Sequence, residues 1–112
     1  MASKFVARKA SNGKFFFVLK AANGETILQS QMYVAMADCA AGVESVRASA
    51  QLDERFQRLD SRNGEPYFTL TAANGQVVGQ SEMYSSVRAR DNGIESVKKN
   101  APQAVFDDQS AD

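Results

Sequence analysis

Two sets of polar and apolar residues recur at equivalent places in the chain, and their types suit ligand binding. Ser30 and Ser81 each follow a glutamine, and each precedes a Met-Tyr pair, Met32-Tyr33 or Met83-Tyr84. Methionine and tyrosine can form an apolar wall while serine and glutamine supply hydrogen bonds, as in small-molecule pockets. The spacing therefore predicts two symmetry-related pockets. The alternative is structural: Met and Tyr close one end of the core, and Ser and Gln satisfy backbone groups.

The sequence does not support catalysis in the same way. The chain has no histidine, which excludes Ser-His and Cys-His nucleophiles and histidine-ligated metals. Cys39 is the single cysteine and has no second thiol for a disulfide or a zinc site. Glu44 and Glu95 occupy equivalent places, but each has a basic residue three positions later, an ordinary pair on a helix surface. We therefore expect a protein without enzymatic activity, cofactor or metal.

Basic and aromatic residues suggest a second kind of site. The 13 basic and 13 acidic residues give no net charge. The basic residues lie in residues 4–50 and 55–101, whereas five of the acids lie between or after these two stretches, which are therefore mildly basic. We expect Arg55 and Arg58 to project from the same face of one strand, with Tyr67 and Phe16 on an uncovered sheet face. Such a surface is typical of nucleic-acid platforms. The alternative is a solvated sheet face with ordinary charges.

A third candidate is the apolar segment that contains Met36. Residues 32–41 carry one charge, Asp38, and include Met32 and Tyr33. Exposed apolar surface with adaptable methionine often contacts another protein. The alternative is that this segment is simply buried more deeply than its counterpart.

A tandem duplication positions all of these residues. Residues 13–50 align without a gap to residues 64–101, an offset of 51, and 16 of the 38 positions are identical. The first repeat covers about residues 4–51, the second about 55–106, and an acidic tail follows over 107–112. We expect the two repeats to fold as a single domain over 1–112, because a unit of about 50 residues buries too little surface alone.

Each repeat predicts a three-stranded meander followed by a helix. Asn-Gly pairs between apolar runs are strong hairpin signals, and each repeat has two. The predicted strands are Phe5–Lys9, Phe15–Ala21, Thr26–Gln29, Phe56–Asp60, Tyr67–Thr71 and Gln76–Gln80, with a further short strand over residues 104–106. After each meander the apolar period becomes helical, which places Cys39, Val43 and Val46 on one stripe and Val87, Ile94 and Val97 on the other. Ser85 is the predicted cap of the second helix, and Gly42 and Gly93 are expected to let helix and sheet approach closely.

The repeated segments AANG, QS-x-MY and G-[VI]-E-S-V resemble the YegP-like family of small bacterial proteins of uncharacterised function. The resemblance covers nearly the whole chain. It implies an α+β fold in which two tandem β(3)-α-β repeats form one antiparallel sheet with two helices on one face, related by pseudo-two-fold symmetry. It also implies that last strands are exchanged between the repeats, so that residues 55–60 serve as the last strand of one and the first of the other. It implies no catalytic residue, cofactor or substrate.

These observations predict a cytoplasmic binding module. The chain starts without the apolar stretch of an export signal, and no segment is long and apolar enough to span a membrane. We expect either another protein as the partner, held by the Met36 segment or the uncovered sheet face, or nucleic acid on that sheet face. An enzyme that uses carboxylates alone is the third alternative.

Overall fold

Asn-Gly turns connect the strands as the sequence predicts. The glycines of the four turns all have positive φ, from 81° at Gly64 to 88° at Gly24. In three of the turns the asparagine side chain accepts a hydrogen bond from the backbone N–H two residues later, as from Asn12 to Lys14 at 2.9 Å. Glycine and asparagine therefore set each turn locally.

The structure, a computed structural model, describes residues 2–110. Its strands are β1 (Lys4–Lys9), β2 (Phe15–Lys20), β3 (Thr26–Gln29), β4 (Phe56–Asp60), β5 (Pro66–Thr71), β6 (Val77–Gln80) and β7 (Val105–Asp108). Its helices are α1 (Met36–Ser49), the short 3₁₀ helix η1 (Asp53–Arg55) and α2 (Val87–Asn100). The predicted acidic tail begins inside β7, since Asp107 and Asp108 are strand residues, and its last two residues lie outside the described range.

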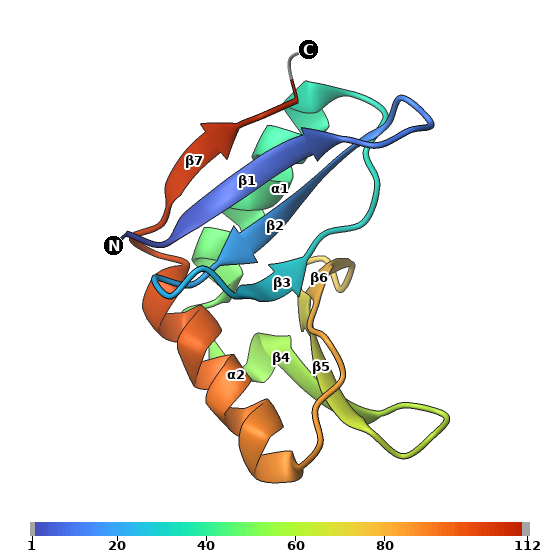
Figure 1. Ribbon diagram of the computed structural model, residues 1–112, viewed down its shortest axis with the longest axis vertical. Helices are drawn as coiled ribbons and strands as arrows, with labels where there is room; N and C mark the ends of the chain where they lie inside the picture. Colours follow the sequence, from blue (N-terminus) through green and yellow to red (C-terminus); the bar gives the residue numbers. More distant parts are fainter. Residues whose placement is uncertain (1, 111–112) are drawn as a thin grey trace.

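The seven described strands form one sheet in the order β4-β5-β6-β3-β2-β1-β7. All neighbours pair antiparallel except β1 and β7, which run parallel, so the predicted antiparallel sheet has one exception. Strand β7 leaves the second repeat and pairs with β1 of the first, which confirms the predicted strand exchange at this edge (Figure 1). At the other edge β4 pairs with β5 alone, so the prediction that residues 55–60 also serve as the last strand of the first repeat was wrong, because β4 occupies only the place that β1 has in that repeat.

The two helices cover one face of the sheet and share one core. Helix α1 packs on β2 of its own repeat and on β5 and β6 of the other, while α2 packs on β5 and on β3. The fully buried side chains include Phe5, Phe17 and Phe68 beneath the helices. Because each helix contacts strands of both repeats, neither repeat has a complete core of its own.

Three details of the helices correct the sequence predictions. Ser86, and not Ser85, caps α2: its hydroxyl accepts a hydrogen bond from the Ala89 N–H at 3.0 Å. Val87, predicted on the buried stripe, is 54% exposed because it begins the helix beyond the edge of the core. Helix α1 begins after Ala35, which has an extended backbone and no side chain that can cap.

The helix glycines accommodate tyrosines rather than the sheet backbone. A Cβ at Gly42 would overlap the Tyr33 hydroxyl and lie 2.9 Å from its Cζ, and a Cβ at Gly93 would overlap Tyr84 in the same way. Each tyrosine ring therefore lies between its helix and the sheet, stacked on Phe17 or Phe68 with centroids 6.3 Å apart.

The repeats meet at a short and unequal junction. The only register pair between β3 and β6 is Gln29 opposite Gln80. Next to it, Leu28 of the first repeat packs against Gly79, its counterpart in the second, and a Cβ at Gly79 would lie 2.6 Å from a Leu28 methyl carbon. One leucine thus fills the space in which two would collide.

Candidate binding surfaces

The side chains of Ser30 and Ser81 form hydrogen bonds with backbone groups of the sheet and of the residue that follows each serine. The Ser30 hydroxyl accepts a hydrogen bond from the Phe17 N–H at 2.9 Å and donates one to the Gln31 carbonyl oxygen at 2.8 Å. Ser81 repeats both bonds with Phe68 and Glu82 at the same distances. Both serines are buried. Their hydrogen bonds therefore satisfy strand backbone, which is the structural alternative considered for them.

A polar hollow lies where the two repeats meet, between the two sites that the sequence predicts. Gln29, Ser30, Gln80 and Ser81 line one depression of about 290 Å³ where β3 meets β6. The pseudo-two-fold axis passes between the equivalent residues, so the glutamines and serines of both repeats lie together at one place. The tyrosines do not line this hollow, since they lie on the helix side of the sheet.

Tyr84 faces a different cavity, of about 210 Å³, between α2 and the β2–β3 turn. Burial is the main cause that raises the pKa of Tyr84, and the carboxylates of Glu82 and Glu25 raise it further. Burial likewise raises the pKa of Tyr33, the equivalent residue. The Tyr84 cavity is thus negatively charged and unsuited to an anion.

The methionines separate into exposed and packed residues. Met32 and Met83 are 45% and 41% exposed beside the tyrosines. Met36 is partly buried and packs against the core. The proposed apolar contact surface is therefore smaller than residues 32–41 suggested, since only Met32 and the neighbouring Val34 are large, apolar and well exposed there.

Arg55 and Arg58 do not lie with Tyr67. Arg55 belongs to η1, where its guanidinium donates a hydrogen bond to the Ser49 hydroxyl at 3.3 Å. Arg58 is paired in register with Phe68, a core residue, whereas Leu59 is paired with Tyr67 on the opposite face. The prediction that these arginines share a surface with Tyr67 was wrong, because β4 begins only at Phe56 and its alternation directs Arg58 toward the helices.

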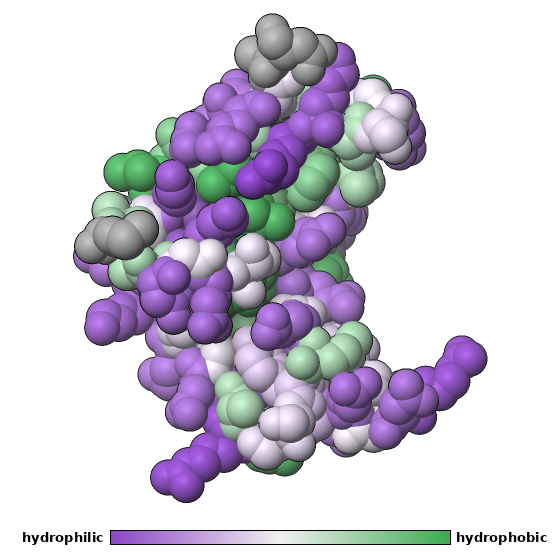
Figure 2. Space-filling view, in the orientation of Figure 1, coloured by the Kyte–Doolittle hydropathy of each residue, from purple (hydrophilic) through white to green (hydrophobic). Residues whose placement is uncertain are grey.

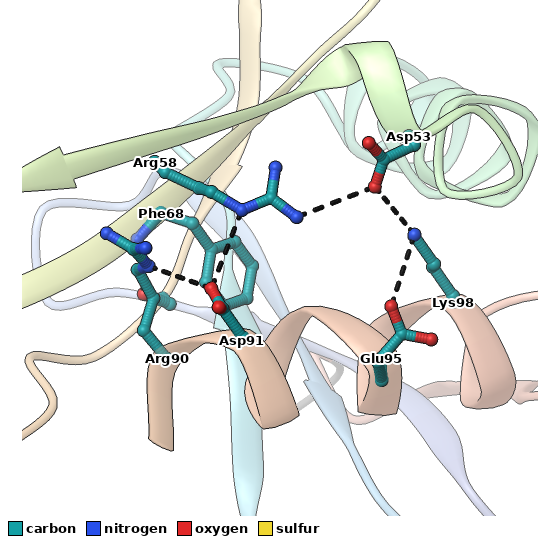
Figure 3. A network of polar contacts seen from close by, with 8 residues as sticks. Asp53, Arg58, Phe68, Arg90, Asp91, Glu95 and Lys98 are labelled. Carbon is teal, nitrogen blue, oxygen red and sulfur yellow. Dashed lines mark hydrogen bonds and ion pairs between the residues drawn. The ribbon is translucent and has the colours of Figure 1, made fainter. Parts of the chain in front are cut away.

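Arg58 instead joins a network of ion pairs with α2 and η1 (Figure 3). It lies 3.6 Å from Asp53 and 3.5 Å from Asp91. Lys98 contacts the same Asp53 oxygen at 2.7 Å. The hydrogen bond from Lys98 lowers the pKa of Asp53, with Arg58 a smaller cause, and the same bond raises the pKa of Lys98. These charges are therefore compensated within the protein.

Arg8 and Lys20, two cations without an ion pair among residues 2–110, lie on the other side of the sheet. We call the side chains of Lys4, Arg8, Phe16 and Lys20, on the helix-free side of β1 and β2, the basic face. Arg8 is paired in register with Phe16, and Lys4 with Lys20, so all four point the same way. In Figure 1 no helix lies in front of β1 and β2, and Figure 2 shows apolar surface there among hydrophilic side chains.

The basic face contains electrostatic repulsion that the fold relieves only in part. Lys4 and Lys20 lie directly opposite each other, an arrangement that is unfavourable for like charges. Asp107 of β7 pairs with Lys4 at 3.7 Å, while Lys20 and Arg8 have no ion pair among residues 2–110. A bound anion would relieve this repulsion.

The second repeat lacks two of the three charges, and the third, Arg55 in the place of Lys4, belongs to η1 and donates to the Ser49 hydroxyl. Leu59 stands in the place of Arg8, Thr71 in the place of Lys20, and Tyr67 in the place of Phe16. Sequence analysis had named Phe16 and Tyr67 but not Arg8, Lys4 or Lys20 as binding residues. A signal was available: residues 1–24 contain five Lys or Arg and no acid.

Nothing in the described part of the chain suggests a metal or a membrane segment. No three His, Cys, Asp or Glu side chains come together among residues 2–110. Within the same range, neither helix has the length and hydropathy needed to cross a bilayer.

Comparison with known proteins gives the class to which this fold belongs. The model of a domain of unknown function, DUF1508, matches the chain twice, over residues 10–57 and 61–108. The chain therefore belongs to this family of tandem-repeat α+β proteins, and no function is established for it. It is 49% identical to a UPF0339 protein of Bordetella pertussis, over 96% of this chain and 97% of that one.

More distant relatives show the same architecture. The UPF0339 protein YegP of Escherichia coli O157:H7 is 43% identical, over 98% of this chain and all of that one. A solution NMR structure of YegP from E. coli matches with a TM-score of 0.94 at 41% identity, covering 100% of this chain and 97% of that one. The structure of a UPF0339 protein from Shewanella oneidensis matches with a TM-score of 0.92 at 43% identity, over 98% and 93% of the two chains. The YegP-like resemblance and the predicted fold class are confirmed.

Proposed function

We propose that this protein is a non-enzymatic binding module whose basic face holds an anionic partner. The observation that carries the proposal is the presence of two unpaired cations, Arg8 and Lys20, on a helix-free sheet face. Most other features of the molecule are accounted for by folding: Ser30 and Ser81 bond to backbone, and Arg58 is held in ion pairs.

The charge distribution supports this assignment of the surface. The acids near α2 pair with Arg58, Arg90 and Lys98, whereas the basic face has only Asp107 for its three cations. An anion that approaches the chain therefore meets uncompensated positive charge at β1 and β2. The cytoplasm is the compartment that we propose for this activity, since a reducing environment suits the one free cysteine, Cys39.

The test replaces the cations of the basic face with the residues of the second repeat. We expect the double variant Arg8→Leu/Lys20→Thr to bind long-chain inorganic polyphosphate at least about ten-fold more weakly than the unmodified protein, because two charge contacts are lost. The slope of log affinity against log salt should decrease by about 1.4. Calorimetric titration over a range of salt concentrations measures both quantities.

A matched control makes the same two substitutions elsewhere. Arg88→Leu/Lys99→Thr on α2 removes two exposed cations that have no ion pair in the described chain, and gives the same change in net charge. We expect this variant to bind polyphosphate as the unmodified protein does. Equal weakening in both double variants, or no polyphosphate binding by the unmodified protein at low ionic strength, would overturn the proposal.

A further inference from the structure

The basic face contains an aromatic ring beside its cations, and this narrows the class of anion that it suits. Phe16 is partly exposed, although its neighbours Phe17 and Val18 are buried. It lies directly opposite Arg8 across the β1–β2 pair. A simple anion would use Arg8 and Lys20 and leave the Phe16 ring in water, whereas a polymer that carries both charges and flat apolar groups would use all three.

From this combination we infer that the partner is a single-stranded nucleic acid, whose phosphates contact Arg8 and Lys20 while a base stacks on Phe16. The inference rests on the proposed function, since it names the anion for the same surface. Base stacking on aromatic side chains beside a basic groove is the general mode of single-strand binding. A duplex does not offer this contact, because its base faces are covered by neighbouring bases.

The surface next to the ring supplies polar groups as well. Val6, Val18, Gln29 and Gln80 form one transverse row across β1, β2, β3 and β6. The two glutamines are exposed and border the polar hollow of about 290 Å³. Their amides can donate to and accept from base edges, so a strand that leaves Phe16 toward the centre of the sheet meets hydrogen-bonding groups.

The variant that tests base stacking removes the Phe16 ring and keeps the charges of Arg8 and Lys20. We expect Phe16→Leu to weaken binding of a fluorescently labelled single-stranded oligonucleotide by about five-fold or more, the loss typical of one stacked base. Binding of inorganic polyphosphate should not change, because polyphosphate has no base. Phe16→Tyr, which introduces the residue of the second repeat, should bind the oligonucleotide as the unmodified protein does.

The controls separate stacking from folding and from other partners. Tyr67→Leu removes the equivalent ring in the second repeat, where Leu59 and Thr71 replace Arg8 and Lys20, and should leave oligonucleotide affinity unchanged. The same oligonucleotide as a duplex should bind more weakly than the single strand. Thermal unfolding of Phe16→Leu shows whether the fold is kept, and the Phe16→Tyr result does not depend on that outcome.

Several results would overturn the inference. Unchanged oligonucleotide affinity in Phe16→Leu, or equal affinity for the duplex, would remove the role of stacking while the polyphosphate result for Arg8→Leu/Lys20→Thr still supports the proposed function. An acidic polyglutamate peptide that binds as tightly as the oligonucleotide and is equally weakened by Phe16→Leu would assign the surface to an acidic protein segment. Failure of polyphosphate binding would overturn both proposals together.

Discussion

Asp53 is the residue on which the largest ion-pair network converges. It accepts a hydrogen bond from Lys98 at 2.7 Å and lies 3.6 Å from Arg58, so it connects η1 to both α2 and β4. The pKa of Asp53 lies below its usual value of 3.8, first because of the bond from Lys98. A carboxyl group whose pKa is lowered on folding stabilises the native state above its unfolded pKa, and this contribution disappears as the pH falls through the folded value.

The pH dependence of stability should reveal this contribution. We expect Asp53→Asn to be less stable than the unmodified protein at pH 7, by a small amount because exposed ion pairs contribute little. The difference should shrink as the pH falls below about 4, where the carboxyl group of the unfolded chain becomes protonated, and vanish at lower pH, once the folded chain is protonated there as well. Urea midpoints measured at a series of pH values test this. Asp60→Asn, at a position without an ion pair among residues 2–110, is the matched control, and a pH-independent difference for Asp53→Asn would contradict the prediction.

The two helices differ at the N-cap, the residue that precedes the first residue of each helix. Ser86 caps α2 through its hydroxyl, while Ala35 occupies the equivalent place in α1 with φ −118° and ψ 146°, a backbone conformation that suits a capping serine. The first helix therefore lacks a hydrogen bond that the second has. The difference lies in the side chain, since both backbones are extended at this position.

Substitutions at the caps should change stability in opposite directions. We expect Ser86→Ala to lower the free energy of unfolding by about 1 kcal/mol and Ala35→Ser to raise it by roughly 0.5–1 kcal/mol. Ser85→Ala, one residue before the cap, should change it by less than about 0.5 kcal/mol. Chemical denaturation measures all three. A loss in Ser85→Ala as large as that in Ser86→Ala would show that the cap is assigned to the wrong residue.

The strands and helices could be predicted from the sequence where the residues that specify them lie close together in the chain. Asn-Gly turns and alternating apolar residues located the hairpins, and the family resemblance supplied the single sheet and the exchange of the last strand, but not the strand order. Arg58 was placed on the wrong face because the strand start at Phe56, one residue after Arg55, decides which side chains alternate together. The role of Gly42 was also beyond the local pattern, since the tyrosine that fills its space comes from another segment. The cations of the basic face were visible in the sequence, but their lack of ion pairs depends on which strands become neighbours.

At the scale of the whole molecule, the arrangement of the two repeats depends on Leu28 and Gly79, equivalent residues of different size that meet near the pseudo-two-fold axis. Leu28 is 1% exposed and packs on Gly79, its counterpart in the second repeat. Two leucines would collide at this place, and two glycines would leave a cavity. The pair therefore favours contact of a first repeat with a second repeat over contact between two identical repeats.

Exchange of these two residues tests the role of their sizes. We expect Gly79→Leu to destabilise the protein by about 1–3 kcal/mol through overpacking, and Leu28→Gly to destabilise it by at least about 2–5 kcal/mol through a cavity. The combined variant Leu28→Gly/Gly79→Leu should lose less than the sum of the two, because one leucine again fills the site. Urea denaturation of the three variants gives the coupling. Strict additivity would mean that the two positions do not share one space.

The parallel pairing of β7 with β1 has a consequence for synthesis of the chain. Strand β1 is translated well before its partner at the sheet edge, which ends at Asp108. Helix α1 likewise waits for β5 and β6, which are translated after it. A nascent first repeat consequently exposes apolar surface that only later residues can cover, and such surfaces make partly synthesised chains prone to aggregation. The sheet edge and the core beneath α1 are therefore completed only after the second repeat has been translated.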